Sequence, residues 1–339
     1  MRTQRTRTAG SKRGTASLKA LHCLAALALC SLPPVLYPLS AGAAGFDSNS
    51  AGTATAQFLK IAPGARGVAM GEAFSALADD ATAIDWNPAG LIKIKSHSLA
   101  LMHSPYLAGT FVDFFAYSQR AGEVGCWGMS VKYMDYGKIV KTDTAGVEIG
   151  EFSPYDVSVA VGFATYITGF NKDPEDRFVL GATGKFIRSE LLSSDSAVSS
   201  DIGVLLPYLF ENRFLISMTV QNLMGTLRYD KFDYPLPLML RLGSLTRVND
   251  NMLVTADFVA PRDNAPFLAM GGEFRTGIGH DVDLFLRGGF NTRSITELGG
   301  LRNITMGTGF RYTIYSIDYS FSPFGDLGSV HRISAALNF

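Results

Sequence analysis

The sequence predicts an all-β protein: a transmembrane antiparallel β-barrel of about 14 strands with an N-terminal plug, or hatch, that contains short helical segments. Three observations support this. The chain begins with an export signal, its later segments alternate apolar and polar residues, and many of them reach the length of about ten residues with which a tilted strand crosses a bilayer. We expect a signal peptide over residues 1–44, the hatch over 45–95 and the barrel over 96–339.

The first 44 residues have the composition of a secretory signal peptide. A basic start precedes an apolar run, no acidic residue occurs before Asp47, and small residues near Ala44 offer a cleavage site. We therefore expect cleavage there and a mature protein in the cell outer membrane. A retained anchor is disfavoured by three prolines between residues 33 and 38, and a lipoprotein modified at Cys30 by the bulky Leu29 before it.

Charge and cysteine content exclude two classes of function. The expected signal carries six basic and no acidic residues, so 24 basic and 30 acidic residues would remain, a net charge of −6. This disfavours a basic surface for nucleic acid, and we expect no nucleic-acid partner. Cys126 would be the only cysteine left, so neither an internal disulfide nor a cysteine-based metal site can form.

Strict alternation defines the strands. Residues 155–163, YDVSVAVGF, place apolar side chains on one face and mostly small or polar ones on the other, and residues 329–339 alternate in the same way. A water-soluble sandwich also alternates, but its strands centre near five or six residues, whereas segments such as RFVLGATGKFIRSEL run to about ten residues or more. Strand length therefore favours a membrane barrel, and the breaks between segments give about fourteen strands, an even number as in bacterial barrels.

The end of the chain has its own signal. Phe339 is preceded at alternate positions by Leu337, Ala335 and Ile333, which resembles the terminal strand that the barrel-assembly machinery recognises in outer-membrane proteins. We expect Phe339 and Leu337 to form this assembly signal. The expected partners are therefore outer-membrane lipid and the barrel-assembly machinery.

The segment before the first strand has the features of a hatch. Met70, Phe74, Leu77 and Ala81 recur at helical spacing, which predicts a short helical piece between Pro63 and Pro88. Glycines in this segment permit close approach of its backbone to a wall. An ordered periplasmic leader is the alternative.

Two segments resemble a known family. Residues 58–91, FLKIAPGARGVAMGEAFSALADDATAIDWNPAGL, resemble the N-terminal signature of the PorV/PorQ outer-membrane proteins, and DYSFSPFGDLGSVHRISAALNF resembles their C-terminal end. That family is related to the FadL transporters, whose fourteen-stranded barrels hold an N-terminal hatch with an Asn-Pro-Ala motif. The resemblance implies a hatch motif comprising Pro63, Gly64, Arg66, Gly67, Gly71, Trp86, Asn87, Pro88, Ala89 and Gly90.

The resemblance implies two alternative functions. PorV-like proteins serve type IX secretion, so the first expectation is a role in protein secretion or surface assembly, with secreted cargo or secretion-system components as partners. The alternative is FadL-like transport of hydrophobic small molecules, with a hydrophobic ligand as partner. The signatures at both ends favour the adaptor, whereas the modest loops favour the transporter.

Motifs of enzymes are absent from the sequence. It contains no nucleophile elbow, phosphate-binding loop or His-Glu-x-x-His pattern, so we expect no catalysis, no cofactor and no metal. Charges expected in the lumen would form ion pairs that fix the hatch, since buried charges need partners; a polar path for a ligand is the alternative. These residues are Lys185, Arg188, Asp281, Asp283, Arg287, Arg311 and Asp318.

Overall fold

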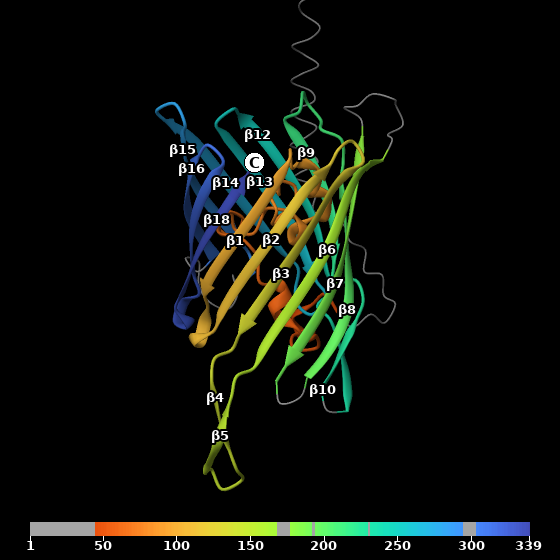
Figure 1. Ribbon diagram of the computed structural model, residues 1–339, viewed down its shortest axis with the longest axis vertical. Helices are drawn as coiled ribbons and strands as arrows, with labels where there is room; N and C mark the ends of the chain where they lie inside the picture. Colours follow the sequence, from red (N-terminus) through yellow and green to blue (C-terminus); the bar gives the residue numbers. More distant parts are fainter. Residues whose placement is uncertain (1–44, 168–176, 192–193, 230, 294–302) are drawn as a thin grey trace, which may run out of the picture. The chain divides into compact units, whose positions relative to one another are not determined.

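A computed structural model describes residues 45–167, 177–191, 194–229, 231–293 and 303–339. In it, fourteen antiparallel strands form a closed barrel in which β18 pairs with β1 (Figure 1). The predicted barrel of about 14 strands with short helical segments is thus confirmed. The expected signal peptide lies outside the described residues.

The barrel consists of long strands joined mostly by short connections. In chain order they are β1 (His97–Pro105), β2 (Phe111–Ala121), β3 (Gly125–Asp135), β6 (Tyr155–Ile167), β7 (Phe178–Glu190), β8 (Ser194–Leu205), β9 (Phe214–Gln221), β12 (Met239–Asn249), β13 (Met252–Pro261), β14 (Phe267–Ile278), β15 (Val282–Asn291), β16 (Ile304–Tyr312), β17 (Tyr315–Pro323) and β18 (Ser329–Asn338). Two hairpins outside the ring are β4 (Ile139–Thr142) with β5 (Glu148–Phe152) and β10 (Thr226–Tyr229) with β11 (Phe232–Pro235).

The helices are short and most precede the barrel. They are η1 (Ser48–Ser50), η2 (Gln57–Lys60), α2 (Ala65–Ala69), α3 (Ala83–Trp86) and η3 (Pro88–Lys93), with η4 (Leu107–Gly109) and η7 (Gly325–Leu327) in loops. The helical piece expected across Met70 to Ala81 is not formed. Gly71 and Glu72 have φ angles of 68° and 70°, in the left-handed region that ends a right-handed helix. The helical spacing in the sequence instead reflects burial, because all four residues at that spacing are buried.

The two ends of the barrel differ in their connections. The end that holds Phe339 has tight turns, such as residues 250–251 between β12 and β13. The opposite end carries both hairpins, and β4–β5 projects well beyond the ring (Figure 1). Outer-membrane barrels have short periplasmic turns and longer extracellular loops. We therefore assign the Phe339 end to the periplasm and the hairpin end to the extracellular side.

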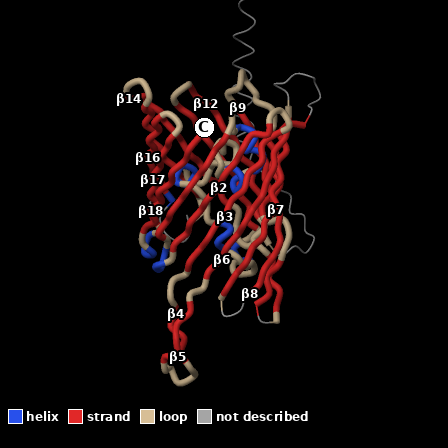
Figure 2. Tube along the Cα trace, in the orientation of Figure 1, coloured by secondary structure: helices blue, strands red, loops and turns tan. Residues whose placement is uncertain are grey.

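The hatch fills the lumen from one end to the other. Near the extracellular end, the backbone N–H of Thr55 donates to the carbonyl of Pro235 at 3.0 Å, and Lys60 pairs with Asp263 at 2.9 Å. Toward the periplasm, α2 contacts β15 to β18, whereas η3 contacts β3, β6, β7 and β8 across the barrel. The helical segments of the hatch accordingly lie inside the ring of strands in Figure 2.

Wall glycines make room for backbone and side-chain atoms of the hatch. A Cβ atom on Gly181 would lie 2.2 Å from the backbone N of Ala89, and one on Gly203 would lie 2.0 Å from Oδ1 of Asn87. Such distances are too short for any side chain, so only glycine fits. Six such positions, which we call the glycine seats, are Gly181, Gly203, Gly243, Gly271, Gly289 and Gly307.

We predict that Gly181→Ala destabilises the seated hatch by about 1–3 kcal/mol, because an added methyl group overpacks the interface. Gly184 is the matched control: it lies on the outward face of the same strand, where an added Cβ would meet open space. The measurement is the thermal unfolding midpoint in detergent together with proteolysis of the hatch. Equal effects of Gly181→Ala and Gly184→Ala would contradict the assignment of Gly181 as a seat.

Candidate functional site

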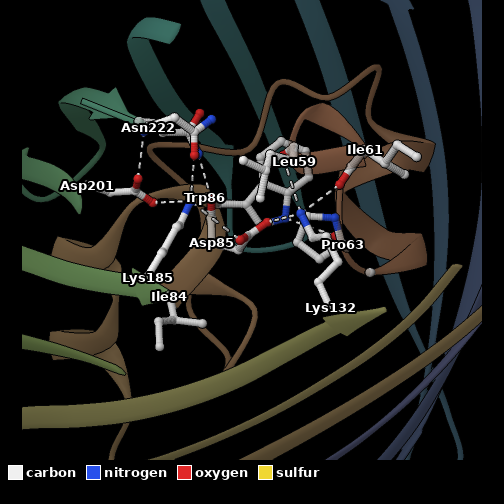
Figure 3. Close-up of polar contacts among 12 residues, drawn as sticks. Leu59, Ile61, Pro63, Ile84, Asp85, Trp86, Lys132, Lys185, Asp201 and Asn222 are labelled. Carbon is white, nitrogen blue, oxygen red and sulfur yellow. Dashed lines mark hydrogen bonds and ion pairs between the residues drawn. The ribbon is translucent and has the colours of Figure 1, made fainter. Parts of the chain in front are cut away.

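A buried ionic cluster joins the hatch to the barrel wall. Asp85, in α3 of the hatch, lies between Lys132 of β3 and Lys185 of β7 (Figure 3). Its carboxylate is 2.5 Å from Lys132 Nζ and 3.9 Å from Lys185 Nζ. Lys185 is also 2.6 Å from Asp201 of β8. We call Asp85, Lys132, Lys185 and Asp201 the latch cluster.

Further hydrogen bonds satisfy the two lysines of the latch cluster. Lys132 Nζ donates to the carbonyl of Ile61 at 2.9 Å, and Lys185 Nζ donates to Oδ1 of Asn222 at 3.1 Å. Burial by itself raises the pKa of the Asp85 carboxyl, but Lys132 and Lys185 together outweigh this effect and hold the pKa below its usual value. Asp85 is therefore charged at neutral pH and attracts both lysines.

Trp86, next to Asp85, joins the hatch to β12. Its indole Nε1 donates to the carbonyl of Pro63 at 3.0 Å, which ties two parts of the hatch together. Arg241 of β12 lies over the Trp86 ring, with its guanidinium carbon 5.2 Å from the ring centroid. Arg241 is in turn 3.6 Å from Asp257. The indole thus packs under a cation that is itself paired.

The Asn-Pro-Ala stretch forms a fully buried turn at the start of η3. Asn87 Nδ2 donates to the carbonyl of Ser75 at 3.0 Å, while its Oδ1 accepts from the backbone N of Ala89 at 3.1 Å. Pro88 occupies the first position of the helix, where a missing N–H is harmless. The amide of Asn87 therefore links the two halves of the hatch next to the glycine seats.

A second chain of charges joins α2 to the opposite wall. Arg66 contacts Asp79 of the hatch at 2.6 Å and Glu273 of β14 at 2.8 Å. Glu273 also pairs with Arg287 at 2.7 Å, and Arg287 reaches Asp318 at 2.6 Å. The two ionic groups thus hold the hatch from both sides of the lumen.

The periplasmic mouth contains two adjoining cavities of about 500 and 530 Å³. Both are lined by Arg66, Asp79, Phe285 and Arg311. Lys93 lines the first, and burial lowers its pKa to about 8, an effect that Asp79 opposes and neighbouring arginines reinforce. This mouth is consequently polar and open to water.

One side of the extracellular half of the lumen is lined by apolar side chains. Phe58 and Leu59 of the hatch belong to one buried apolar cluster with inward side chains from the extracellular ends of the strands and hairpins. We call these wall residues the apolar collar: Val112, Phe114, Met134, Ile187, Leu227 and Leu236. Apolar contacts therefore surround this part of the hatch on one side of the lumen, whereas charged side chains line the cavities at the periplasmic mouth.

The structure places most of the expected lumen charges inside the barrel or at its periplasmic end. Lys185, Arg287 and Asp318 are buried in ionic groups of the lumen, and Arg311 lines the periplasmic cavities. Asp283 pairs with Arg275 at 2.9 Å near the periplasmic end.

Two of the expected lumen charges lie elsewhere. Arg188 is on the outward face, paired with Glu190, because residues three apart on a strand, such as Lys185 and Arg188, face opposite sides. Asp281 is exposed in the turn before β15, beyond the strand. The expectation that these two residues face the lumen is corrected accordingly.

The expected hatch motif residues all lie in the lumen segment between Pro63 and Gly90, and they are buried apart from a partly covered Arg66. Phe339 stacks on His97 at a centroid distance of 5.0 Å, where the last residue of the chain meets the first strand. Leu337 lies on the outward face of β18. Recognition by an assembly machinery remains an expectation.

Sequence reasoning missed several residues of the ionic groups. Asp85, Lys132, Asp201, Arg241, Asp257 and Glu273 are all buried in the lumen. The sequence could have indicated that Lys132 faces the lumen, because Lys132 shares its strand face with Cys126, Gly128 and Ser130. Nothing in the sequence indicated that Asp85 is buried, since an acidic residue in an irregular segment is usually exposed.

The described residues contain no helix long and apolar enough to cross a membrane. Within the same ranges, no group of three or more His, Cys, Asp or Glu side chains is placed to hold a metal ion.

The chain was compared with protein-family models, curated proteins and solved structures. A family model described as Uncharacterised protein family (UPF0164) matches residues 37–166. No curated protein matches the chain.

Solved outer-membrane proteins resemble the barrel. The toluene transporter TodX of Pseudomonas putida is 11% identical with a TM-score of 0.55, covering 82% of this chain and 98% of its own. A Pseudomonas aeruginosa FadL homologue is 10% identical, with a TM-score of 0.50 over 81% of this chain and 98% of its own. The CymD monoaromatic hydrocarbon channel is 12% identical, with a TM-score of 0.50 over 81% and 97%. The chain shares the FadL-like outer-membrane barrel fold.

We predict that Asp85→Asn releases the hatch, because removing one partner of a buried ion pair destabilises by about 3–5 kcal/mol. Trp86 and Trp127 are the two tryptophans, so Trp127→Phe leaves Trp86 as a hatch reporter. At neutral pH, acrylamide should quench Trp86 in Asp85→Asn but not in the parent. The exposed Asp113→Asn is the matched control.

The pH dependence follows from the lowered pKa of Asp85. Its stabilisation is fully present above the unfolded aspartate value of about 3.9 and is lost as the pH falls through the lower folded value. Quenching of Trp86 in the parent should therefore begin only below about pH 4. A shielded Trp86 in Asp85→Asn at neutral pH would show that the latch cluster does not hold the hatch.

Proposed function

We propose that this protein is a FadL-like channel that passes hydrophobic small molecules across the outer membrane. The observation that carries the proposal is the apolar collar on one side of the extracellular half of the lumen, because water-filled pores present polar side chains there. Phe58 and Leu59 of the hatch belong to the same buried apolar cluster as the collar and would be displaced by an entering apolar molecule. The FadL-like fold supports the proposal, since TodX is a toluene transporter and CymD a monoaromatic hydrocarbon channel.

The hatch must move or yield for a molecule to pass. The latch cluster, the glycine seats and the charge chain around Arg66 hold it on both sides of the lumen. The polar cavities at the periplasmic mouth would receive the molecule after it passes the hatch. With the hatch seated in this way the lumen is closed, and the hatch would act as its gate.

A reversible cross-link tests this gate. Ser75 of the hatch and Ser217 of β9 have their Oγ atoms 2.9 Å apart, and both side chains are buried. We predict that a Ser75→Cys/Ser217→Cys variant in a Cys126→Ser background forms a disulfide that blocks uptake of radiolabelled toluene, and that reduction restores uptake. The assay uses cells that lack their own hydrophobic channel.

Each single-cysteine variant serves as the control, since it carries the same substitution without a cross-link. Equal uptake by the oxidised and reduced double variant would exclude the hatch as the gate. Equal uptake by cells with and without the protein would exclude transport of this class of molecule altogether.

The PorV/PorQ-like role in secretion or surface assembly is a second proposal. The feature that favours it is the β4–β5 hairpin, whose Ile139, Val140, Val147 and Ile149 are exposed beyond the barrel. Pull-down of the tagged protein from its own membranes distinguishes the two roles. Exported proteins with a shared C-terminal domain would support the adaptor, and their loss after deletion of residues 139–152 would locate the contact.

A further inference from the structure

Four buried polar side chains gather on the lumen side of β16 to β18 without hydrogen-bond partners among the described residues. The unpartnered atoms are Asn303 Nδ2, Ser320 Oγ, Ser322 Oγ and Arg332 Nε. Ser320 and Arg332 are directly opposite each other in neighbouring strands, and Ser322 follows on the same face. Asn303 directly precedes β16. We call these four residues the β16–β18 patch. Buried polar groups are nearly always satisfied, so the patch points to a bound group.

Among the described residues, the charges around the patch do not balance. Glu72 of the hatch pairs with Arg293 at 2.5 Å, and Asp257 pairs with Arg241 at 3.6 Å. Arg332 acts on Glu72 only at longer range, and its nearest aromatic contact is Tyr106, with 5.8 Å between the guanidinium carbon and the ring centroid. Three guanidinium groups therefore face two carboxylates. Arg332, which is 3% exposed, carries the surplus charge.

The chemistry of the patch selects an anion. A guanidinium, two hydroxyls and an amide NH₂ can all donate hydrogen bonds, and no carboxylate is among them. A guanidinium buried without a counter-charge is costly, whereas a hydrogen-bonded anion offsets that cost. One surplus positive charge matches one negative charge. We propose that the β16–β18 patch binds a small monoanion, either a halide ion or a carboxylate group, that neutralises Arg332.

The site lies beside the anchors of the hatch. Thr305, on the same wall face, accepts from the backbone N of Gly71 at 3.0 Å and donates to the carbonyl of Ala69 at 3.1 Å. Ser334 accepts from the backbone N of Ala65 at 2.6 Å. The bound anion compensates Arg332 where α2 is attached, so it stabilises the closed protein. This inference does not depend on which molecules the channel passes.

The first experiment locates the anion directly. Crystals of the mature chain grown in sodium bromide should show an anomalous peak within hydrogen-bond distance of Arg332 and Ser320. The peak should be absent from Arg332→Gln and retained in Arg188→Gln, the same change at an exposed strand arginine on the outward face. Acetate in place of bromide should give planar density at the same position if a carboxylate is the better ligand.

The second experiment measures binding in solution. At constant ionic strength, the thermal midpoint of the detergent-solubilised protein should rise with the logarithm of the bromide or acetate concentration, relative to a bulky sulfonate. A rise with bromide alone indicates a halide site, and a rise with acetate alone a carboxylate site. Arg332→Gln should abolish the dependence and Arg188→Gln should keep it.

A third variant keeps the test independent of folding defects. Ser320→Ala/Ser322→Ala retains every charge and should reduce the anion dependence at least tenfold in apparent affinity. An unchanged dependence in this variant and in Arg332→Gln would overturn the proposal. So would a bromide peak in the crystal with no anion dependence in solution, since it would reflect binding at crystal concentration only.

Discussion

The close contact between the hatch and the barrel wall is the constraint on which the rest of the structure depends. At the six glycine seats the hatch lies where a side chain of the wall would otherwise be. Close packing of this kind fixes the position of the hatch along the wall, because protein interiors tolerate neither overlapping atoms nor large voids. The same placement brings Asp85 between its two lysines and brings Arg66 to Glu273.

Buried charges then give this packing its specificity. A hatch held only by apolar contacts could slide within the lumen, whereas a displaced ion pair leaves uncompensated charges in a site from which water is largely excluded. The latch cluster and the chain from Arg66 to Asp318 lie against different parts of the wall. Small displacements therefore disrupt both groups together, which favours two discrete states of the hatch over gradual movement.

The two ends of the lumen bear on the proposed transport. An apolar molecule entering from outside would meet the apolar collar on one side of the lumen, and beyond the hatch it would meet cavities lined by charged residues such as Arg311 and Lys93. The ionic groups that hold the hatch would then set the barrier to its passage. Low sequence identity to the solved barrels is compatible with a shared fold, because alternation and glycine placement can be met by many sequences.

The sequence by itself determined the barrel, because alternation and strand length are local properties. Within each strand, apolar residues mark the lipid face and small or polar residues mark the lumen face. Alternation also shows that Lys185 and Arg188, three residues apart, cannot share a face. Local spacing was insufficient at Met70 to Ala81, where left-handed Gly71 and Glu72 break the helix. Only the tertiary structure decided the partners of Asp85 and the role of the glycine seats. Those contacts join the hatch to wall residues from 47 positions (Asp85 to Lys132) to 238 positions (Ala69 to Gly307) further along the chain. Barrel closure, not sequence spacing, brings them together.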